Sequence, residues 1–537
     1  MLLTVAILLP LAAAVVLLAV PELTGRAAVW AWIAASAADL ALVAWMWWRY
    51  DPGQGPSGVV GGIAYEVDVR WIPTVDAGYH IGLDGLSLPL LALTGVLFLA
   101  CAVWSLREPD RPRTKAALFL FLQTACLGTF AALDLILFFV FFDLTIVGMY
   151  FVIAGWGHGD ARRSALKFFL YTFVGSLALL VGFIGLFLGS EERTFDMVVL
   201  ADNPPLTDSP LAGGLVLLAI GLGLAVKTPL VPFHTWLPDA HTDAPAAGSA
   251  ILAGILLKLG TYGFVRIAMP ILPDAWQRWA MVVVVVGVIS VLWGAFVALA
   301  QTNVKRMIAY TSVNHMGYVL LGLGAAGLVG QADEQARTIA TVGAVYQMVA
   351  HGLLTGALFL LSGVLWSRGG TYAFDRWGGL ARPAPVFAAL LAVAAFGSLG
   401  LPGFASFIAE FQIFTGALQA APVATVLAVT GILVTAGLFL GALQRLLTGP
   451  TVVLAVPQSS SDDTAGDVAP SSRPMVQGST ATATRPRTAT GMRDVHGSEL
   501  AAVVPLLALA VLLGLFPRAL LDVIEPAAAA VAQLVAR

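Results

Sequence analysis

Long blocks of apolar residues recur along the whole chain and are separated by short polar segments. Most blocks are about 18 to 25 residues long, the length of helix that crosses the hydrocarbon core of a bilayer. We therefore predict an all-α polytopic membrane protein with about fourteen transmembrane helices. The expected spans are residues 2–20, 27–48, 83–106, 114–133, 134–155, 163–189, 210–238, 245–268, 278–300, 304–328, 338–366, 384–418, 423–446 and 499–519.

Two of these blocks are longer than a simple crossing and are interrupted. In the block 210–238, Pro229 and Pro232 each remove a backbone donor, so a continuous helix is not expected. In the block 384–418, the stretch "GSLGLPGFAS" (397–406) divides an otherwise apolar run. Broken helices are tolerated at membrane depth only where protein or water satisfies the freed backbone groups.

The positions of the two breaks predict the organisation of the chain. Broken helices at matching places in two halves are typical of inverted repeats with an ion site in each half. We expect two inverted five-helix repeats, each containing one broken helix. The predicted units are an N-terminal part with three helices and an outer loop (1–110), the first repeat (111–270), the second repeat (271–448), a disordered cytoplasmic linker (449–497) and a C-terminal transmembrane helix (498–537).

Two polar segments differ from the spans. The stretch 457–494 is rich in Ser, Thr, Ala and Pro and cannot bury a core, which predicts disorder. The stretch 49–80 contains the alternating run "YEVDVRWI", which favours a short β-hairpin.

Composition and charge agree with a membrane location. The chain is 59% hydrophobic and 11% charged, whereas soluble domains carry about 25% charged residues. This composition excludes a soluble globular class. Most of the 28 lysines and arginines fall in the loops that follow odd-numbered spans. By the positive-inside rule these loops face the cytoplasm, so both termini are expected on the outer side.

We single out six ionisable residues inside the expected spans, where a charge costs several kcal/mol. One such residue alone would favour a structural role, but six with both signs favour function. Asp143 and Lys227 could form a pair in which each keeps the other charged, which is the logic of a proton relay. The six residues are Asp143, Lys227, Lys258, His315, His351 and Glu410.

Other motifs point to no further chemistry. "GLGAAG" (322–327) has the spacing of a dinucleotide loop but follows an apolar helical run, so close helix contact is expected instead. "HTWLPDAH" contains His234, Asp239 and His241, whose spacing favours a helix cap or a water-lined opening over a metal site. Cys101 and Cys126 give neither a disulfide framework nor an iron–sulfur spacing. We expect no metal or cofactor site in this chain.

Several of these stretches together resemble one family. "AVKTPLVPFHTWLPDAHTDAPAAGSAILAGILLKLGTYG" (225–263) closely resembles the signature of the antiporter-like subunits of proton-pumping NADH:quinone oxidoreductase, respiratory complex I. Supporting stretches are "RRSALKFFLYTFVGS" (162–176), "NVKRMIAYTSVNHMGY" (303–318), "QMVAHGLLTGALFLLSG" (347–363) and "LPGFASFIAEF" (401–411). The resemblance covers roughly residues 80–450. It implies fourteen core helices with two inverted five-helix repeats.

The resemblance also implies a role for each ionisable residue. Asp143 stands where the family has a glutamate that pairs with the seventh-helix lysine, here Lys227. Lys258 matches the central lysine of the eighth helix. His315 and His351 match polar residues of the central hydrophilic axis, and Glu410 matches the ionisable residue of the broken twelfth helix. At that last position the M-type branch has glutamate, whereas the L-type and N-type branches have lysine. In this respect the chain resembles the M-type branch. The aspartate at 143 is one methylene shorter than the family pattern, so its carboxylate reaches about one bond length less far toward Lys227.

The function implied by the resemblance is proton translocation in the membrane arm of an NADH:quinone oxidoreductase in a bacterial plasma membrane. The implied partners are L-type and N-type subunits, other membrane subunits and lipids, in a hetero-oligomer without nucleic acid. Flavin and iron–sulfur clusters are expected in partner subunits and not in this chain. Three alternatives stay open: a subunit of a multisubunit sodium/proton antiporter, a subunit of a proton-pumping membrane hydrogenase, and a scaffold whose charges only lock helices together.

Overall fold

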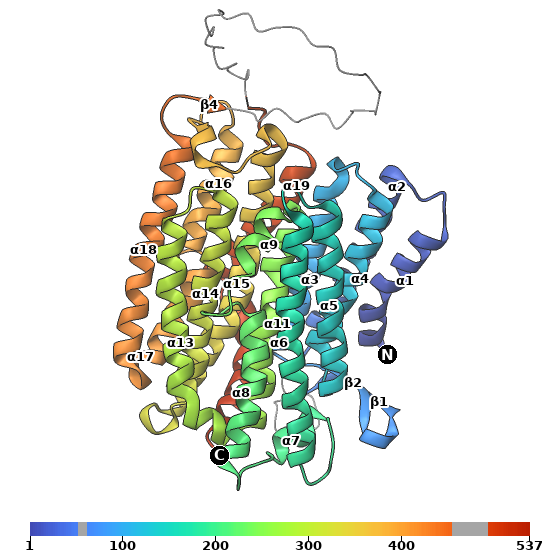
Figure 1. Ribbon diagram of the computed structural model, residues 1–537, viewed down its shortest axis with the longest axis vertical. Helices are drawn as coiled ribbons and strands as arrows, with labels where there is room; N and C mark the ends of the chain where they lie inside the picture. The colour runs from blue at the N-terminus through green and yellow to red at the C-terminus, as the bar shows by residue number, and fades with distance from the viewer. Residues whose placement is uncertain (52–61, 454–491) are drawn as a thin grey trace, which may run out of the picture.

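The fold is a bundle of long helices that run side by side between two ends of the molecule (Figure 1). The structure is a computed structural model that describes residues 1–51, 62–453 and 492–537. Most of the predicted linker, residues 454–491, lies outside the described residues. The helices are α1 (Leu2–Ala19), α2 (Gly25–Trp48), α3 (Ser87–Trp104), α4 (Pro112–Ala131), α5 (Leu135–Trp156), α6 (Ala161–Gly189), α7 (Met197–Asp202), α8 (Pro210–Lys227), α9 (Leu237–Asp243), α10 (Ala246–Ile251), α11 (Leu257–Gly263), α12 (Met269–Ile271), α13 (Pro273–Leu299), α14 (Val304–Ala326), α15 (Glu334–Gly369), α16 (Pro385–Ser398), α17 (Ala405–Ala420), α18 (Pro422–Leu447), α19 (Ser498–Leu515) and α20 (Arg518–Val535).

Four short strands complete the described structure. Strands β1 (Ala64–Ile72) and β2 (Ala77–Leu83) form an antiparallel hairpin, which confirms the hairpin predicted for this region. Strands β3 (Trp377–Gly378) and β4 (Val452–Val453) pair at the opposite end of the bundle. We call the two ends the hairpin end and the β3–β4 end. The C-terminus lies at the hairpin end, at the bottom of Figure 1.

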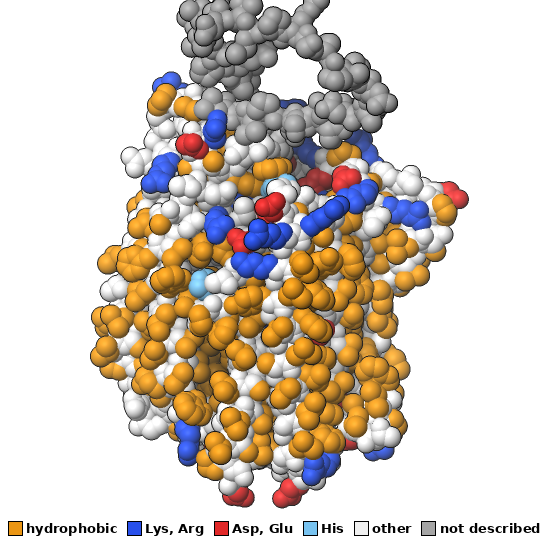
Figure 2. Space-filling model, in the orientation of Figure 1, with side chains coloured by type: hydrophobic (Ala, Val, Ile, Leu, Met, Phe, Trp, Pro, Cys, Tyr) orange, Lys and Arg blue, Asp and Glu red, His pale blue; other side chains and the backbone are white. Residues whose placement is uncertain are grey.

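The helical class predicted from the apolar blocks is confirmed. By length and composition, twelve helices of the described residues could cross a membrane, with α10 to α12 counted as one continuous segment. An apolar belt lies between two ends at which charged side chains gather (Figure 2). Helix α14 and the pair α16–α17 are not among the twelve. The count of fourteen spans, the inverted repeats and the boundaries of the five units therefore stay predictions.

Capping residues and prolines explain where several helices begin. Asp134 accepts hydrogen bonds from the backbone of Ile136 and Leu137 at the start of α5. Asn303 accepts from Arg306 at the start of α14. Other helices begin with a proline, whose missing N–H is not needed in the first turn; they are α4, α8, α13, α16 and α18.

The central helices are fully surrounded by protein, whereas the outer ones face outward over much of their surface. The segment from α10 to α12 and helix α15 are buried over their whole apolar window, but α1, α2 and α18 are only about one third buried. Glycines allow close contact between the inner helices. A Cβ on Gly322 or Gly324 of "GLGAAG" would lie within 2.9 Å of backbone atoms of α15 or α13. This stretch is therefore a helix contact.

Candidate functional site

The first group of site residues lies where α8 stops. Lys227 is the last residue of α8, and its side chain is almost fully buried. Its Nζ donates a hydrogen bond of 2.8 Å to Oγ1 of Thr145 and lies 4.5 Å from the ring centroid of Phe142. Both partners are on α5, so the ammonium is held by the helix that also carries Asp143.

Asp143 and Lys227 are electrostatic neighbours without direct contact. No Asp143–Lys227 ion pair within 4.0 Å occurs in the described structure, and Oδ1 of Asp143 is buried without a hydrogen-bond partner. Its carboxylate also interacts with Ser176 on α6. Thr145, and not Asp143, is thus the side chain that accepts a hydrogen bond from the ammonium of Lys227.

The second group begins at Lys258 on α11, between two π-helical segments (Leu252–Leu256 and Phe264–Ala268). π-helical turns interrupt the regular backbone ladder and often occur at functional sites. The buried Nζ of Lys258 donates to the carbonyl of Ala253 at 2.6 Å. The same Nζ lies 2.5 Å from Nδ1 of His351 on α15. An ammonium and an imidazole nitrogen at this distance can exchange a proton directly.

From His351 the group continues to α14 and α17. The ring centroids of His351 and His315 are 5.3 Å apart. Nδ1 of His315 accepts from Nε2 of Gln347 at 3.2 Å and lies 3.7 Å from Oε1 of Glu410. All of these side chains are buried. Four of the six predicted residues therefore form one row across the middle of the bundle.

The break between α16 and α17 places Glu410. Gly400 has a φ of +72°, which L side chains rarely adopt, and a Cβ there would lie 2.3 Å from Oε2 of Glu410. The hydroxyl of Ser406 donates to the carbonyl of Gly397 across the break. The carboxylate thus rests against glycine backbone, in space that any side chain at position 400 would fill.

The structure brings the six predicted residues together as two groups. Asp143 and Lys227 form one, and Lys258, His351, His315 and Glu410 form the other. Between the described side chains, no hydrogen bond or ion pair joins Lys227 to Lys258. Their helices do touch, since a Cβ on Gly260 of α11 would lie 2.3 Å from Oγ1 of Thr228. The two groups thus lie on touching segments without a direct side-chain bond between Lys227 and Lys258 in the described structure.

Sequence reasoning did not single out three side chains of this region as site residues: Gln347, Thr145 and His241. His241 on α9 is fully buried, stacks on Phe359 at 4.5 Å, and has no hydrogen-bond partner at either ring nitrogen in the described structure. It is close enough to interact electrostatically with Lys258 and Lys305. The sequence signal that could have indicated His241 is its position shortly after the break that follows Lys227. His234 faces elsewhere, accepting from Nε1 of Trp293 at 3.1 Å, so the two histidines of "HTWLPDAH" do not share a site.

A charged cluster lies near the β3–β4 end of α6, α9 and α14. Asp239 accepts from Nζ of Lys167 at 2.6 Å and from Nη1 of Arg306 at 3.1 Å. These three side chains are each about one third or more exposed. Deeper in, the buried Lys305 donates to the carbonyl of Ala244 and lies 5.0 Å from the ring centroid of Tyr372. Charged groups thus lead from this surface toward His241.

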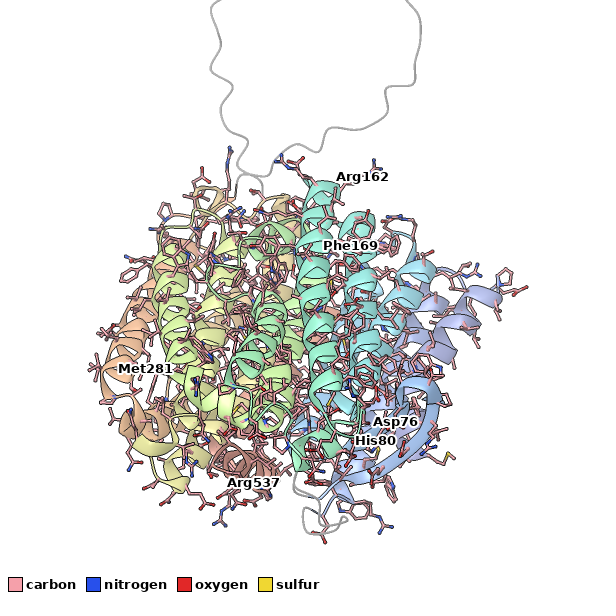
Figure 3. All side chains as sticks on the ribbon, turned by 60° about the horizontal axis from the view of Figure 1, so that its bottom comes forward. Asp76, His80, Arg162, Phe169, Met281 and Arg537 are labelled. Carbon is pink, nitrogen blue, oxygen red and sulfur yellow. The ribbon has the colours of Figure 1, made fainter. Side chains whose placement is uncertain are left out.

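A separate charged cluster holds the hairpin. His80 on β2 lies at the hairpin end with Arg537, away from Arg162 (Figure 3). Its Nδ1 is 2.6 Å from Asp196 at the start of α7, and its Nε2 is 2.8 Å from Glu66 on β1. Burial alone would lower the pKa of His80, but Asp196 and Glu66 outweigh burial and raise it to about 9. The imidazolium therefore clamps the hairpin onto α7.

Comparison with known proteins shows which family has a sequence like that of this chain. The family model described as NADH:quinone oxidoreductase/Mrp antiporter, TM, matches residues 132–435, which include all six predicted residues. The chain belongs to this family. A relative within it is NADH-quinone oxidoreductase subunit M of Rickettsia conorii, 36% identical over 86% of this chain and 85% of that protein. F420H2 dehydrogenase subunit M of Methanosarcina mazei is 39% identical over 72% of this chain and 77% of that protein. Relatives named subunit M confirm the resemblance to the M-type branch.

Solved structures of the NADH:quinone oxidoreductase/Mrp antiporter family share the fold over the whole chain. A chain of respiratory complex I from Thermus thermophilus aligns with a TM-score of 0.82 and 28% identity, covering all of both chains. A chain of the Mrp complex from Dietzia sp. aligns with a TM-score of 0.81 and 24% identity over the same extent, which supports the fold alone. The described helices are therefore those of a membrane subunit in a larger complex.

Proposed function

We propose that this chain is a proton-translocating membrane-arm subunit of an NADH:quinone oxidoreductase. The observation that carries the proposal is the buried row Lys258–His351–His315–Glu410, because it joins four titratable groups on four different helical segments. Titratable groups inside a membrane are costly and mark proton paths. The relatives named subunit M and the likeness to a complex I chain support the assignment to that assembly.

The geometry supports a stepwise transfer along the row. Lys258 hands a proton to Nδ1 of His351 across 2.5 Å. His315 then receives it across the gap between the two rings, and Glu410 receives it once the 3.7 Å between its Oε1 and Nδ1 of His315 closes to hydrogen-bonding distance. Gln347 donates to Nδ1 of neutral His315, so Nδ1 carries the lone pair that takes up the proton, and the same nitrogen faces Glu410.

The polar groups outside the row Lys258–His351–His315–Glu410 deliver protons to Lys258. Protons enter at the charged cluster of Asp239 and reach Lys258 by way of Lys305 and His241. The pair Asp143 and Lys227 acts as a switch by its charge, since a change in its separation alters the electrostatic field at Lys258 without direct contact. The β3–β4 end, where Lys and Arg residues gather, faces the cytoplasm, and the hairpin end with both termini faces outward.

This assignment leaves the redox chemistry to partner subunits. Flavin and iron–sulfur clusters belong to those subunits, and this chain supplies neither a cofactor site nor a metal site. L-type and N-type subunits are its neighbours in a hetero-oligomer within a bacterial plasma membrane. The membrane chains similar to this one come from such multisubunit complexes.

The test is Lys258→Ala in the assembled complex. The expected result is normal assembly and bound flavin, with coupled proton pumping suppressed in proteoliposomes. Full pumping by the assembled variant would overturn the proposal. A scaffold role predicts instead that neutral replacements of Asp143 or Lys227 block assembly. Sodium-dependent proton flux without NADH would point to the antiporter branch of the family.

A further inference from the structure

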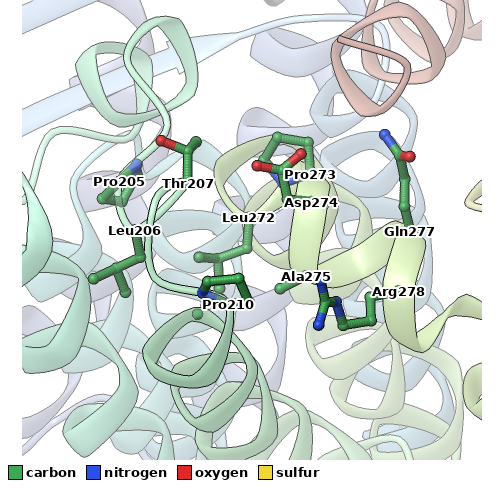
Figure 4. Close-up of a pocket in the computed structure, with 11 residues that line it drawn as sticks. Pro205, Leu206, Thr207, Pro210, Leu272, Pro273, Asp274, Ala275, Gln277 and Arg278 are labelled. Carbon is green, nitrogen blue, oxygen red and sulfur yellow. The ribbon is translucent and has the colours of Figure 1, made fainter.

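Two adjoining cavities lie at the hairpin end of α8 and α13. The first has a volume of about 450 Å³ and polar walls that include Thr207, Asp274, Gln277 and Arg278 (Figure 4). The second has a volume of about 800 Å³ and is lined almost wholly by apolar side chains. Both are bounded by Arg278 and Pro210, so the polar cavity borders the apolar one at these two residues. Together they form a site with a polar head and an apolar body.

The apolar cavity is a groove along the outer face of α8. Its walls run from Pro210 to Ala225 on α8, which corresponds to roughly 22 Å at 1.5 Å per residue. The far end reaches Pro232 and Phe233, beyond the break that follows Lys227. Gly221 opens the middle of the groove, because a Cβ placed there would meet no atom within 4 Å. This face lies in the apolar belt, so its natural occupant is a hydrocarbon chain.

The polar cavity offers charges of both signs. Arg278 is exposed, and its guanidinium has no ion pair or hydrogen bond with any described residue. Asp274, four residues earlier in the first turn of α13, is exposed as well. The indole of Trp279 is half-exposed beside them, as is typical at a membrane interface. A guanidinium matches a phosphate, and a carboxylate matches an ammonium group.

We propose that this composite cavity binds one phospholipid with an ammonium-bearing head group, with its phosphate on Arg278, its ammonium near Asp274 and one acyl chain in the groove along α8. The apolar groove alone would suit any acyl chain. The neighbouring charges of opposite sign select a zwitterionic head group over a purely anionic one. The end of the acyl chain lies against Phe233, close to the broken segment.

The first experiment counts retained phospholipids in the purified complex by native mass spectrometry after delipidation and addition of synthetic phosphatidylethanolamine. Gly221→Leu places a side chain in the groove at a position where a Cβ meets no atom within 4 Å, so this variant is expected to retain one molecule fewer than the wild type. Gly437→Leu on α18 is the matched control, since a Cβ there also meets open space outside the groove, and it should retain the wild-type number. Equal retention in Gly221→Leu and the wild type would overturn the proposal. Loss of a neighbouring subunit with an unchanged lipid count would assign the groove to a protein partner, which also overturns it.

The second experiment tests the head group. Arg278→Gln should weaken retention of phosphatidylethanolamine about tenfold, because a charge-assisted contact is lost. Asp274→Asn should remove the preference for phosphatidylethanolamine over phosphatidylglycerol while leaving the groove occupied. Retention that is unchanged in both variants would overturn the head-group assignment. These readouts do not depend on proton pumping, so their outcome is separate from that of the proposed function.

Discussion

Replacing Gly400 by alanine tests whether the break between α16 and α17 places Glu410 for proton transfer. The added Cβ would lie 2.3 Å from Oε2 of Glu410, whereas ordinary contact begins at 3.4 Å. The carboxylate must therefore move by at least about 1 Å. Oε1 already lies 3.7 Å from Nδ1 of His315, so the transfer distance leaves little room for such a shift. A displacement of about 1 Å can slow a reaction by ~100-fold.

A backbone effect can be separated from this displacement. Alanine at a left-handed position costs about 1–2 kcal/mol, and Gly403 in the same break also has a left-handed φ, of +99°. A Cβ on Gly403 meets no atom within 4 Å. The variant Gly403→Ala therefore carries a comparable backbone cost without touching Glu410, which makes it the matched control.

The assay is NADH-driven proton uptake into inverted membrane vesicles, normalised to the amount of assembled complex. We expect Gly400→Ala to lose most of its pumping rate and Gly403→Ala to keep most of it. Equal pumping by Gly400→Ala and Gly403→Ala would refute the reasoning.

Three further predictions concern contacts outside the break. The folded-state pKa of His80, raised to about 9, exceeds the ordinary value of about 6.5. Its clamp to Asp196 therefore stabilises the hairpin fully below pH 6.5 and loses this contribution as the pH rises through 9. Limited proteolysis at β1–β2 should increase over that window, and a His80→Gln variant should show no such pH dependence. Asp84→Asn breaks the buried pair with Arg266, whose Nη2 lies 2.5 Å from Oδ2, and should cost about 3–5 kcal/mol of stability. A large drop in the thermal unfolding temperature in detergent checks this, and a drop no larger than that of Glu334→Gln at the surface would contradict it. Thr145→Val removes the hydroxyl beside Lys227 while keeping the side-chain shape, at a cost of about 1–3 kcal/mol. Pumping should fall with assembly intact, whereas unchanged pumping would show that the Thr145 contact does not hold the ammonium for function.

The apolar blocks predicted most of the helices. A helix that crosses a membrane satisfies its backbone hydrogen bonds within itself and places apolar side chains in an apolar environment, so a long apolar block indicates such a helix. The two breaks were also predictable, from Pro229 and Pro232 in one block and from the Gly- and Pro-containing stretch 397–406 in the other. Helix α20 was not predicted as a separate element, although its apolar residues recur at helical spacing on one face. It follows the last apolar block. A search for long apolar runs does not detect such an amphipathic segment, because polar residues interrupt the apolar ones.

The site residues were predictable as buried ionisable groups, but their contacts were not. Periodicity shows that Lys258 and His351 lie inside spans, yet it does not show that α11 and α15 bring them within 2.5 Å. Likewise it could not show that Thr145, rather than Asp143, holds the ammonium of Lys227. Such contacts depend on helix rotation and on glycine contacts between helices, which arise only from the assembled bundle.

The most direct test of the central claim is the number of protons pumped per electron by the reconstituted complex carrying Glu410→Gln. Glutamine keeps the shape of the side chain but cannot take up a proton, so the row ends at His315. We predict a lower proton-to-electron ratio with normal assembly, and an unchanged ratio for Glu334→Gln, which alters an exposed carboxylate on α15 in the same way. A wild-type ratio in the assembled Glu410→Gln complex would contradict the account.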